Sequence, residues 1–164
     1  MNSLNREVEY VQNQAVGSAI LWRFVCGYYT NNNRPVPFPL LFIVLPIILR
    51  QDLCMVIKGT RKVSGLSKVS EKLFKNKEND SIHYVNKTAI AMRELTLSSF
   101  NIAVEANLFS LMIESATVFP LETEIKKYTP KGDSKTMLDT AEKLGLWCSD
   151  LTLLEISKWL KVRF

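Results

Sequence analysis

The sequence is poor in the residues from which most catalytic and metal sites are built. Its 164 residues include one histidine, three cysteines and six glycines. It has no Cys-x-x-Cys spacing and no glycine-rich phosphate loop, so zinc sites and nucleotide sites are not expected. His83 follows Asp80 by three residues, which is typical of an ordinary surface pair on a helix. We therefore expect no catalytic residue, no metal and no cofactor, and predict that the chain is not an enzyme.

Disulfides and membrane segments are also not expected. Cys26, Cys54 and Cys148 are widely scattered and lie in apolar stretches, which indicates buried thiols in a reducing compartment. The most hydrophobic run, residues 35–49, contains several prolines and is flanked by arginines, whereas a spanning helix needs about 20 apolar residues. Acidic residues precede the first apolar stretch, which is the wrong order for a signal peptide. We expect a cytoplasmic protein that makes no contact with membranes.

What the sequence does have is the composition of a globular protein, 47% hydrophobic and 23% charged. Its length suits a single domain over residues 1–164. We divide it into apolar N-terminal helices (13–58), a basic helical segment with a loop (59–79), a long helix (80–107), and a hairpin with a C-terminal unit (108–164).

The N-terminal half is predicted to be helical with one extended connection. Asn13 can cap a helix that ends in the polar run 30–33, and the prolines of residues 34–39 favour an extended link. Residues 40–49 are apolar on every side, and Pro46 favours a buried, kinked helix over a central strand. Two short helices follow, at residues 52–58 and 66–75, with a turn-rich link between them and a loop at 76–79.

The C-terminal half begins with the longest periodic segment, which predicts one central helix over residues 80–107. Residues 108–113 and 116–119 predict a small β-hairpin, and 120–132 a loop. A helix over 134–144 would be capped by Asp133 and stopped by Gly145, and Thr152 with Glu155 forms a capping box for a last helix over 153–161. The fold class is therefore mainly α with a small β-hairpin, winged-helix-like at the C-terminus.

Positive charge gathers in one window of the chain. Residues 58–77 hold seven basic residues and one acid, Glu71, although the net charge of the whole chain is only +5. Such a stripe can neutralise phosphates, or it can be a solvated lysine face, and both interpretations stay open. The candidates for DNA contact are Lys58, Arg61, Lys62, Lys68, Lys72 and Lys75.

Aromatic residues crowd the first helix. Burial in the core is their default interpretation, because large aromatics are usually buried. The amount of apolar surface in residues 13–58 also suits a partner protein. The candidates for a partner interface are Trp22, Phe24, Tyr28, Tyr29 and Trp159.

Several short motifs occur in an order that resembles a known family. They are Asn13 with Gly17, Leu21-Trp22-x-Phe24, Gly27-Tyr28, the apolar run 40–49, Arg61-Lys62-x-Ser64-Gly65-Leu66, Arg93-Glu94-Leu95-Thr96-Leu97, Ala141-Glu142-Lys143-Leu144-Gly145 and Leu160-Lys161-Val162-Arg163-Phe164. The set resembles the middle component of three-component ABC-ATPase systems, also described as the accessory subunit of Lamassu-type antiphage defence.

The resemblance implies a non-enzymatic adaptor of winged-helix character. Its partners would be an SMC-like ATPase with a long coiled coil and an effector, often a nuclease, that stays silent until foreign DNA is sensed. The adaptor would bridge ATPase, effector and double-stranded DNA. The family offers no catalytic pattern to carry over to this chain.

A stand-alone winged-helix transcription regulator is the alternative from a different class. It would need a recognition helix with Arg, Asn or Gln near its N-terminal end to read base edges. Neither 66–75, which presents Ser and Lys, nor 153–161, which presents Leu, Glu and Ser, offers this.

Overall fold

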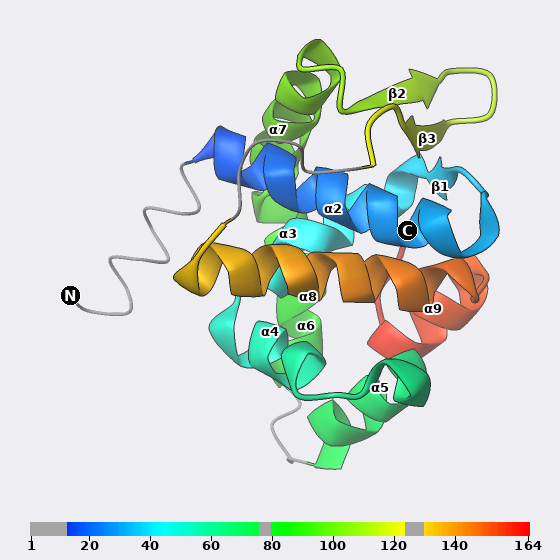
Figure 1. Ribbon diagram of the computed structural model, residues 1–164. Coiled ribbons are helices and arrows are strands. Elements are labelled where there is room, and N and C mark those ends of the chain that lie inside the picture. The colour runs from blue at the N-terminus through cyan, green and yellow to red at the C-terminus, as the bar shows by residue number, and fades with distance from the viewer. Residues whose placement is uncertain (1–12, 76–79, 124–129) are drawn as a thin grey trace.

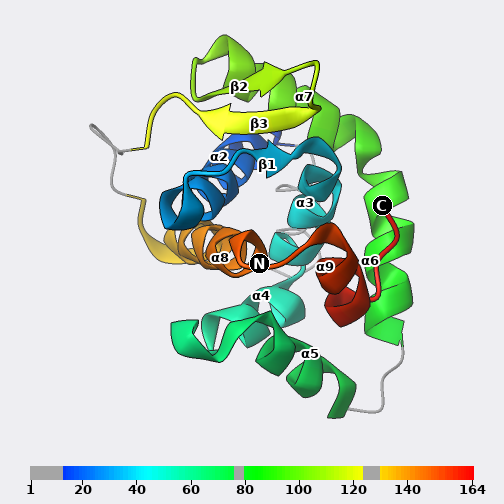
Figure 2. The same ribbon diagram turned by 90° about the vertical axis from the view of Figure 1, so that its right-hand side faces the viewer.

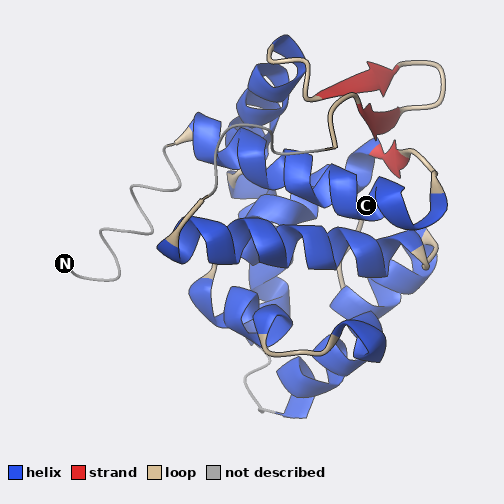
Figure 3. Ribbon diagram, in the orientation of Figure 1, coloured by secondary structure: helices blue, strands red, loops and turns tan. Residues whose placement is uncertain are grey.

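The computed structural model describes residues 13–75, 80–123 and 130–164, with the side chains of residues 74, 75 and 80–84 outside that description. The loops predicted at 76–79 and in the middle of 120–132 lie outside the described residues. The described part is mainly helical with one small antiparallel sheet, as predicted (Figures 1 and 3).

Helix α2 (Gln14–Asn32) runs through the middle of the fold (Figure 1). Its predicted cap is confirmed, because the Asn13 side-chain oxygen accepts hydrogen bonds from the backbone N–H groups of Ala15 and Val16, at 3.1 and 3.2 Å. The helix continues through the polar run and ends at Asn33, whose φ of 52° is left-handed. Its sides pack against three later elements, which are α7 (Arg93–Glu105), strand β3 (Thr117–Pro120) and α8 (Gly132–Ser149).

The apolar run 40–49 is buried and helical, as predicted, with a change of helix type in place of a simple kink. A 3-10 helix, η1 (Phe38–Ile43), passes into the short helix α3 (Val44–Ile48). Pro46 lies in the first turn of α3, where the missing N–H is not needed. Among the described residues, no single helix has the length and apolar character to cross a membrane. One pair of segments, Phe38–Ile48 and Gln51–Lys58, has that length and composition when the two are taken together, but the pair is bent by 101°.

Helices α4 (Gln51–Lys58) and α5 (Gly65–Lys75) follow, as predicted, with a 3-10 turn, η2 (Lys62–Ser64), between them. Helix α4 ends at Gly59.

The single long helix predicted for residues 80–107 is not confirmed. The segment forms α6 (Asp80–Ala91) and α7 (Arg93–Glu105), separated at Met92, whose backbone (φ −92°, ψ 7°) leaves the helical region. The two helices share η1 as a neighbour but differ in their other contacts: α6 packs on α3, whereas α7 packs mainly on α2. The break therefore lies between the part of the segment that covers α3 and the part that covers α2.

Helix α8 (Gly132–Ser149) is longer than predicted at both ends. The prediction that Gly145 stops it was wrong, and Asp133 lies in its first turn instead of capping it. Gly145 is a contact residue: a Cβ added there would lie 2.1 Å from the carbonyl oxygen of Phe24 in α2. In the same way, a Cβ on Gly27 would lie 2.1 Å from the carbonyl oxygen of Glu142 in α8. The two glycines let the backbones of these parallel helices touch (Figure 1).

The predicted hairpin is present as β2 (Phe109–Met112) and β3 (Thr117–Pro120). It gains a third strand, β1 (Val36–Pro37), from the proline-rich link, and the antiparallel order is β1-β3-β2 with Val36 opposite Val118. Proline is tolerated in β1 because that strand lies at the edge of the sheet.

The winged-helix arrangement predicted for the C-terminus is not confirmed. The sheet packs on α2, away from the C-terminal helix α9 (Leu153–Leu160), whose main neighbour is α5 (Figure 2). The capping box of α9 is confirmed: Thr152 Oγ1 accepts from the Glu155 N–H at 3.2 Å, and Glu155 Oε2 accepts from the Thr152 N–H at 2.7 Å.

Gly145→Ala should destabilise the fold, although alanine is the better helix former. The substitution gains about 1 kcal/mol of helix propensity. Overpacking typically costs about 1–3 kcal/mol and occasionally more. Here the obstacle is a backbone carbonyl at 2.1 Å, which cannot rotate away. We expect a net loss in the free energy of unfolding, measured by urea denaturation.

Gly59→Ala is the matched control for this experiment. Gly59 has an ordinary φ of −77°, and an added Cβ would lie 3.3 Å from its nearest neighbour, the Met55 carbonyl oxygen. The free energy of unfolding of Gly59→Ala should stay within about 1 kcal/mol of the wild-type value. Equal stabilities of the two variants would contradict the close contact of α2 and α8.

Candidate functional site

The predicted basic segment is built around the C-terminal end of α4. The last carbonyl groups of a helix have no partner within the helix. Lys143, from α8, supplies one: its Nζ donates to the carbonyl oxygens of Ile57, Lys58 and Thr60 at 3.3, 2.9 and 3.0 Å. A cation at this end also complements the helix dipole.

Residues 59–65, which we call the basic link, are held by side chains from two helices. Lys72 of α5 donates to Thr60 Oγ1 at 2.9 Å and approaches the Gly59 carbonyl oxygen at 3.4 Å. Trp147 of α8 donates its Nε1–H to the Lys62 carbonyl oxygen at 2.7 Å. Gly65 closes the link at a φ of +68°, where a side chain would be strained.

The link therefore has a fixed backbone and exposed side chains. Arg61, Lys62 and Val63 are all exposed, Val63 by 93%. No ion pair joins Arg61 or Lys62 to an acidic group in the part of the chain that the structure describes. The link thus presents two cations to solvent, while side chains of α5 and α8 hold its backbone in place.

A cavity of about 360 Å³ lies beside the link, between α4 and α8. Lys58 borders it and donates to Thr136 Oγ1 at 3.3 Å. Asp139 is the one acidic residue of its lining, whereas the lining holds three lysines. Together with the neighbouring residues of the link and α5, these lysines form what we call the basic cluster: Lys58, Lys62, Lys72, Lys135 and Lys143.

Positive charge in the basic cluster is only partly compensated. The pKa of Lys143 is lowered, first by burial of its ammonium group and then by the charges of Lys62 and Lys72. Mutual repulsion of this kind would be relieved by a bound anion. The cluster is therefore suited to a phosphate or another negatively charged group.

The six predicted DNA-contact residues have different positions. Lys58, Arg61 and Lys62 are exposed at the link, whereas Lys72 is occupied in holding it. Lys68 pairs with Glu71 at 2.5 Å, and the side chain of Lys75 lies outside the described residues.

Sequence reasoning missed Lys135 and Lys143. They are eight residues apart, a spacing that places both on one broad face of α8, and both line the same cavity. Nothing in the local sequence indicates that this face would meet the end of α4.

The predicted partner-interface residues divide in two. Trp22, Phe24 and Tyr28 are buried in the core of this chain, with exposures of 8, 0 and 6%, so the default interpretation describes them and they offer no surface to a partner. The Trp22 Nε1–H also donates to the Glu122 carbonyl oxygen at 2.7 Å. Tyr29 and Trp159 keep part of their surface in solvent.

The remaining reactive groups are enclosed. Cys26, Cys54 and Cys148 are buried free thiols, and burial raises the pKa of each, that of Cys26 to about 12. Among the described residues, no three His, Cys, Asp or Glu side chains gather in a way that could hold a metal ion. The side chains of Asp80 and His83 lie outside the description.

The structure is thus that of a small, mainly helical protein whose clearest chemical feature is a cationic loop held on its core. The family model of the ABC-three component (ABC-3C) system Middle Component 3 matches residues 1–164, so the chain belongs to that family. The resemblance seen in the sequence motifs is thereby confirmed at the level of the three-component system. No curated protein and no solved structure gives a significant match.

Lys143→Met should test the structural role of this lysine. Methionine keeps the apolar stem but removes the ammonium group that serves three carbonyl oxygens. Leaving partly buried acceptors without a donor costs about 1–3 kcal/mol, less the relief of repulsion with Lys62 and Lys72. We expect a lower free energy of unfolding. We also expect faster hydrogen exchange at the Thr60 amide, which in the wild type donates to the Ile57 carbonyl oxygen.

Lys135→Met is the control, since Lys135 borders the same cavity but is exposed. It should change the free energy of unfolding by no more than about 0.5 kcal/mol. If both variants have the same stability and the same Thr60 exchange, Lys143 does not cap α4.

Proposed function

We propose that this chain is the non-enzymatic adaptor of its ABC-three component system. It joins the ABC ATPase to an effector and touches DNA phosphates through the basic link. The observation that carries the proposal is the match to the Middle Component 3 family along residues 1–164. The motif resemblance supports the finer form of the proposal: a cytoplasmic, Lamassu-type antiphage complex with an SMC-like ATPase and a nuclease effector.

The basic link supports the DNA part of the proposal. Phosphate contacts require cations that are exposed and well positioned, and they do not require a base-reading helix. Arg61 and Lys62 are exposed, while Lys143 and Trp147 hold the backbone beneath them. A loop that is ordered before binding loses little conformational entropy when it binds.

A stand-alone winged-helix regulator has less support. Its wing should lie beside a recognition helix, whereas the hairpin packs on α2. Helix α5 presents Ser and Lys and has no Arg, Asn or Gln with which to read base edges.

Co-purification tests the adaptor role. When the chain is tagged and produced together with the ABC ATPase and the third component of its system, both should elute with it in a fixed ratio. The isolated chain should hydrolyse neither ATP nor nucleic acid, because no catalytic constellation is evident in its sequence. A chain that elutes alone would contradict the proposal. So would hydrolysis that follows the chain through purification and is lost when one of its carboxylates is replaced.

Arg61→Glu combined with Lys62→Glu tests the DNA contact. The double variant changes the charge of the link by four units while leaving its backbone carbonyl contacts in place. The assembled complex should bind double-stranded DNA more weakly, and the slope of log affinity against log salt should fall by roughly 0.9 for each lost phosphate contact. The loss should be similar on unrelated DNA sequences, because phosphates carry no sequence information.

Lys87→Glu combined with Lys131→Glu is the matched control, with the same charge change at two exposed lysines outside the basic cluster. It should leave the salt slope unchanged. Unchanged DNA affinity in the link variant, with loss of the ATPase from the complex, would make the link a protein interface. No change in either measurement would make it a solvated surface.

A further inference from the structure

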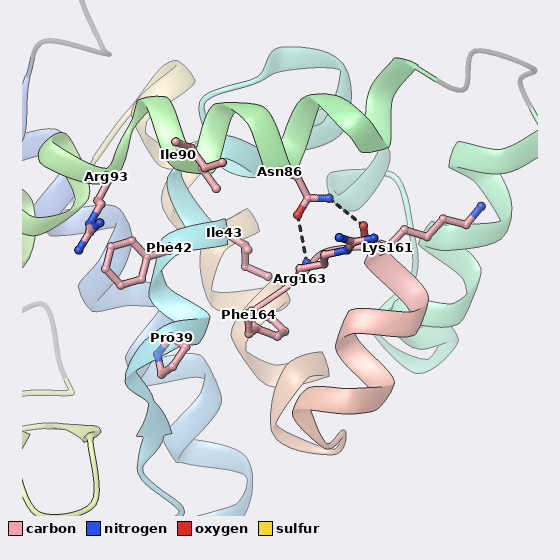
Figure 4. Close-up of a pocket in the computed structure, with 10 residues that line it drawn as sticks. Pro39, Phe42, Ile43, Asn86, Ile90, Arg93, Lys161, Arg163 and Phe164 are labelled. Carbon is pink, nitrogen blue, oxygen red and sulfur yellow. Dashed lines mark hydrogen bonds between the residues drawn. The ribbon is translucent and has the colours of Figure 1, made fainter.

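A second concave surface lies away from the basic cluster. It is a groove of about 770 Å³ formed by η1, α6, the first residue of α7 and the C-terminal segment 161–164 (Figure 4). The elements that carry the basic cluster, α4, α5 and α8, contribute no residue to it. Its residues are Pro39, Phe42, Ile43, Asn86, Ala89, Ile90, Arg93, Lys161, Arg163 and Phe164.

One wall of the groove is fixed by hydrogen bonds to the backbone. The Asn86 side chain donates to the Lys161 carbonyl oxygen and accepts from the Arg163 N–H, both at 3.0 Å (Figure 4). Ser157 Oγ donates to the Val162 carbonyl oxygen at 2.5 Å, and the Val162 side chain is 1% exposed. Residues 161–164 are thus held in place by these hydrogen bonds and by the buried Val162 side chain. Arg163 and Phe164, which follow Val162, line the groove.

The groove combines an apolar floor with cations. Ile90 is 78% exposed and Phe164 47%, and both line the same groove as Phe42 and Ile43, so the apolar surface there is contiguous (Figure 4). Arg93 and Arg163 also line the groove, and no acidic side chain does. Neither arginine is in an ion pair with any acidic side chain that the structure describes.

This chemistry fits a polypeptide better than a nucleic acid. A DNA backbone would satisfy the arginines but leave Ile90 and Phe164 in water. A peptide that carries a bulky apolar side chain next to a carboxylate would bury the first group and pair with the second. Arginine is the residue best suited to bidentate binding of a carboxylate.

We propose that the groove binds an acidic segment of the ABC ATPase, with an apolar side chain against Ile90 and Phe164 and a carboxylate on Arg93 and Arg163. The proposal rests on the proposed function, because it takes the ATPase to be a direct partner. It adds the surface of contact and the chemistry of the segment that docks there.

The experiment measures the affinity of the full-length chain for the purified ATPase by calorimetry, at low and high salt. Ile90→Glu places a carboxylate on the floor, and it should weaken binding roughly tenfold or more. Arg93→Gln with Arg163→Gln should weaken binding similarly at low salt and also remove most of its salt dependence. The wild type should keep that salt dependence, and Ile90→Glu should keep part of it, because its new carboxylate repels the acidic segment while both arginines remain.

Ile113→Glu is the matched control, since Ile113 is 79% exposed but lies at the hairpin, outside the groove. It should bind the ATPase like the wild type. Circular dichroism should show the same thermal unfolding for all variants, because the replaced side chains are exposed.

The outcomes separate this proposal from the proposed function. If the wild type does not bind the ATPase, both fail. If it binds and the groove variants bind equally well, only the groove assignment fails. Binding that is lost with Ile113→Glu instead would place the interface on the hairpin. A wild-type dimer that Ile90→Glu dissociates, with ATPase affinity unchanged, would make the groove a contact between two copies of this chain and would overturn the proposal.

Discussion

The direct contact of the α2 and α8 backbones determines where the other elements can lie. Gly27 and Gly145 remove the side chains that would keep these helices apart. At the same interface Arg23 pairs with Glu142, and Asn32 donates to the Ser149 carbonyl oxygen at 2.9 Å. Helix α8 holds the basic link with its opposite face. Lys143 and Trp147 each lie two residues from Gly145, which is about half a turn around the helix, so both point away from α2 and toward the link. One helix therefore holds the core and shapes the cationic loop.

Features that depend on neighbouring residues could be predicted from the sequence, and features that depend on distant ones could not. The Asn13 cap, the Thr152–Glu155 box and the hairpin each arise within a few residues. The local sequence predicts that Gly145 stops the helix, because glycine is a poor helix former. Its actual role depends on Phe24, which is far away in the chain. The break at Met92 and the pairing of β1 with β3 likewise depend on elements that local periodicity does not report.

The same distinction applies to the basic site. Composition identified the charged window, and three of its residues, Lys58, Arg61 and Lys62, are exposed around the link. The count of basic residues in the window does not separate lysines that are exposed from lysines that have partners. In the structure Lys68 has an ion-pair partner, Lys72 holds the link, and α8 contributes cations from about 60 to 80 residues further along the chain. The packing of the helices therefore decides which lysines hold the backbone of the link and which are exposed to solvent.

Several of the motifs that carry the family resemblance lie at the helix contact, at the basic link and at the groove. Gly27 and Gly145 bring the core helices together, Gly65 closes the link, and the segment after α9 forms a wall of the groove. The adaptor role proposed above requires more than one binding surface, and the link and the groove are built from different elements of the described chain. Both are fastened to buried residues, Trp147 behind the link and Val162 behind the groove wall. If DNA binds the first surface and the ATPase the second, the shared core fixes the geometry between them, so the chain acts as a spacer of defined shape.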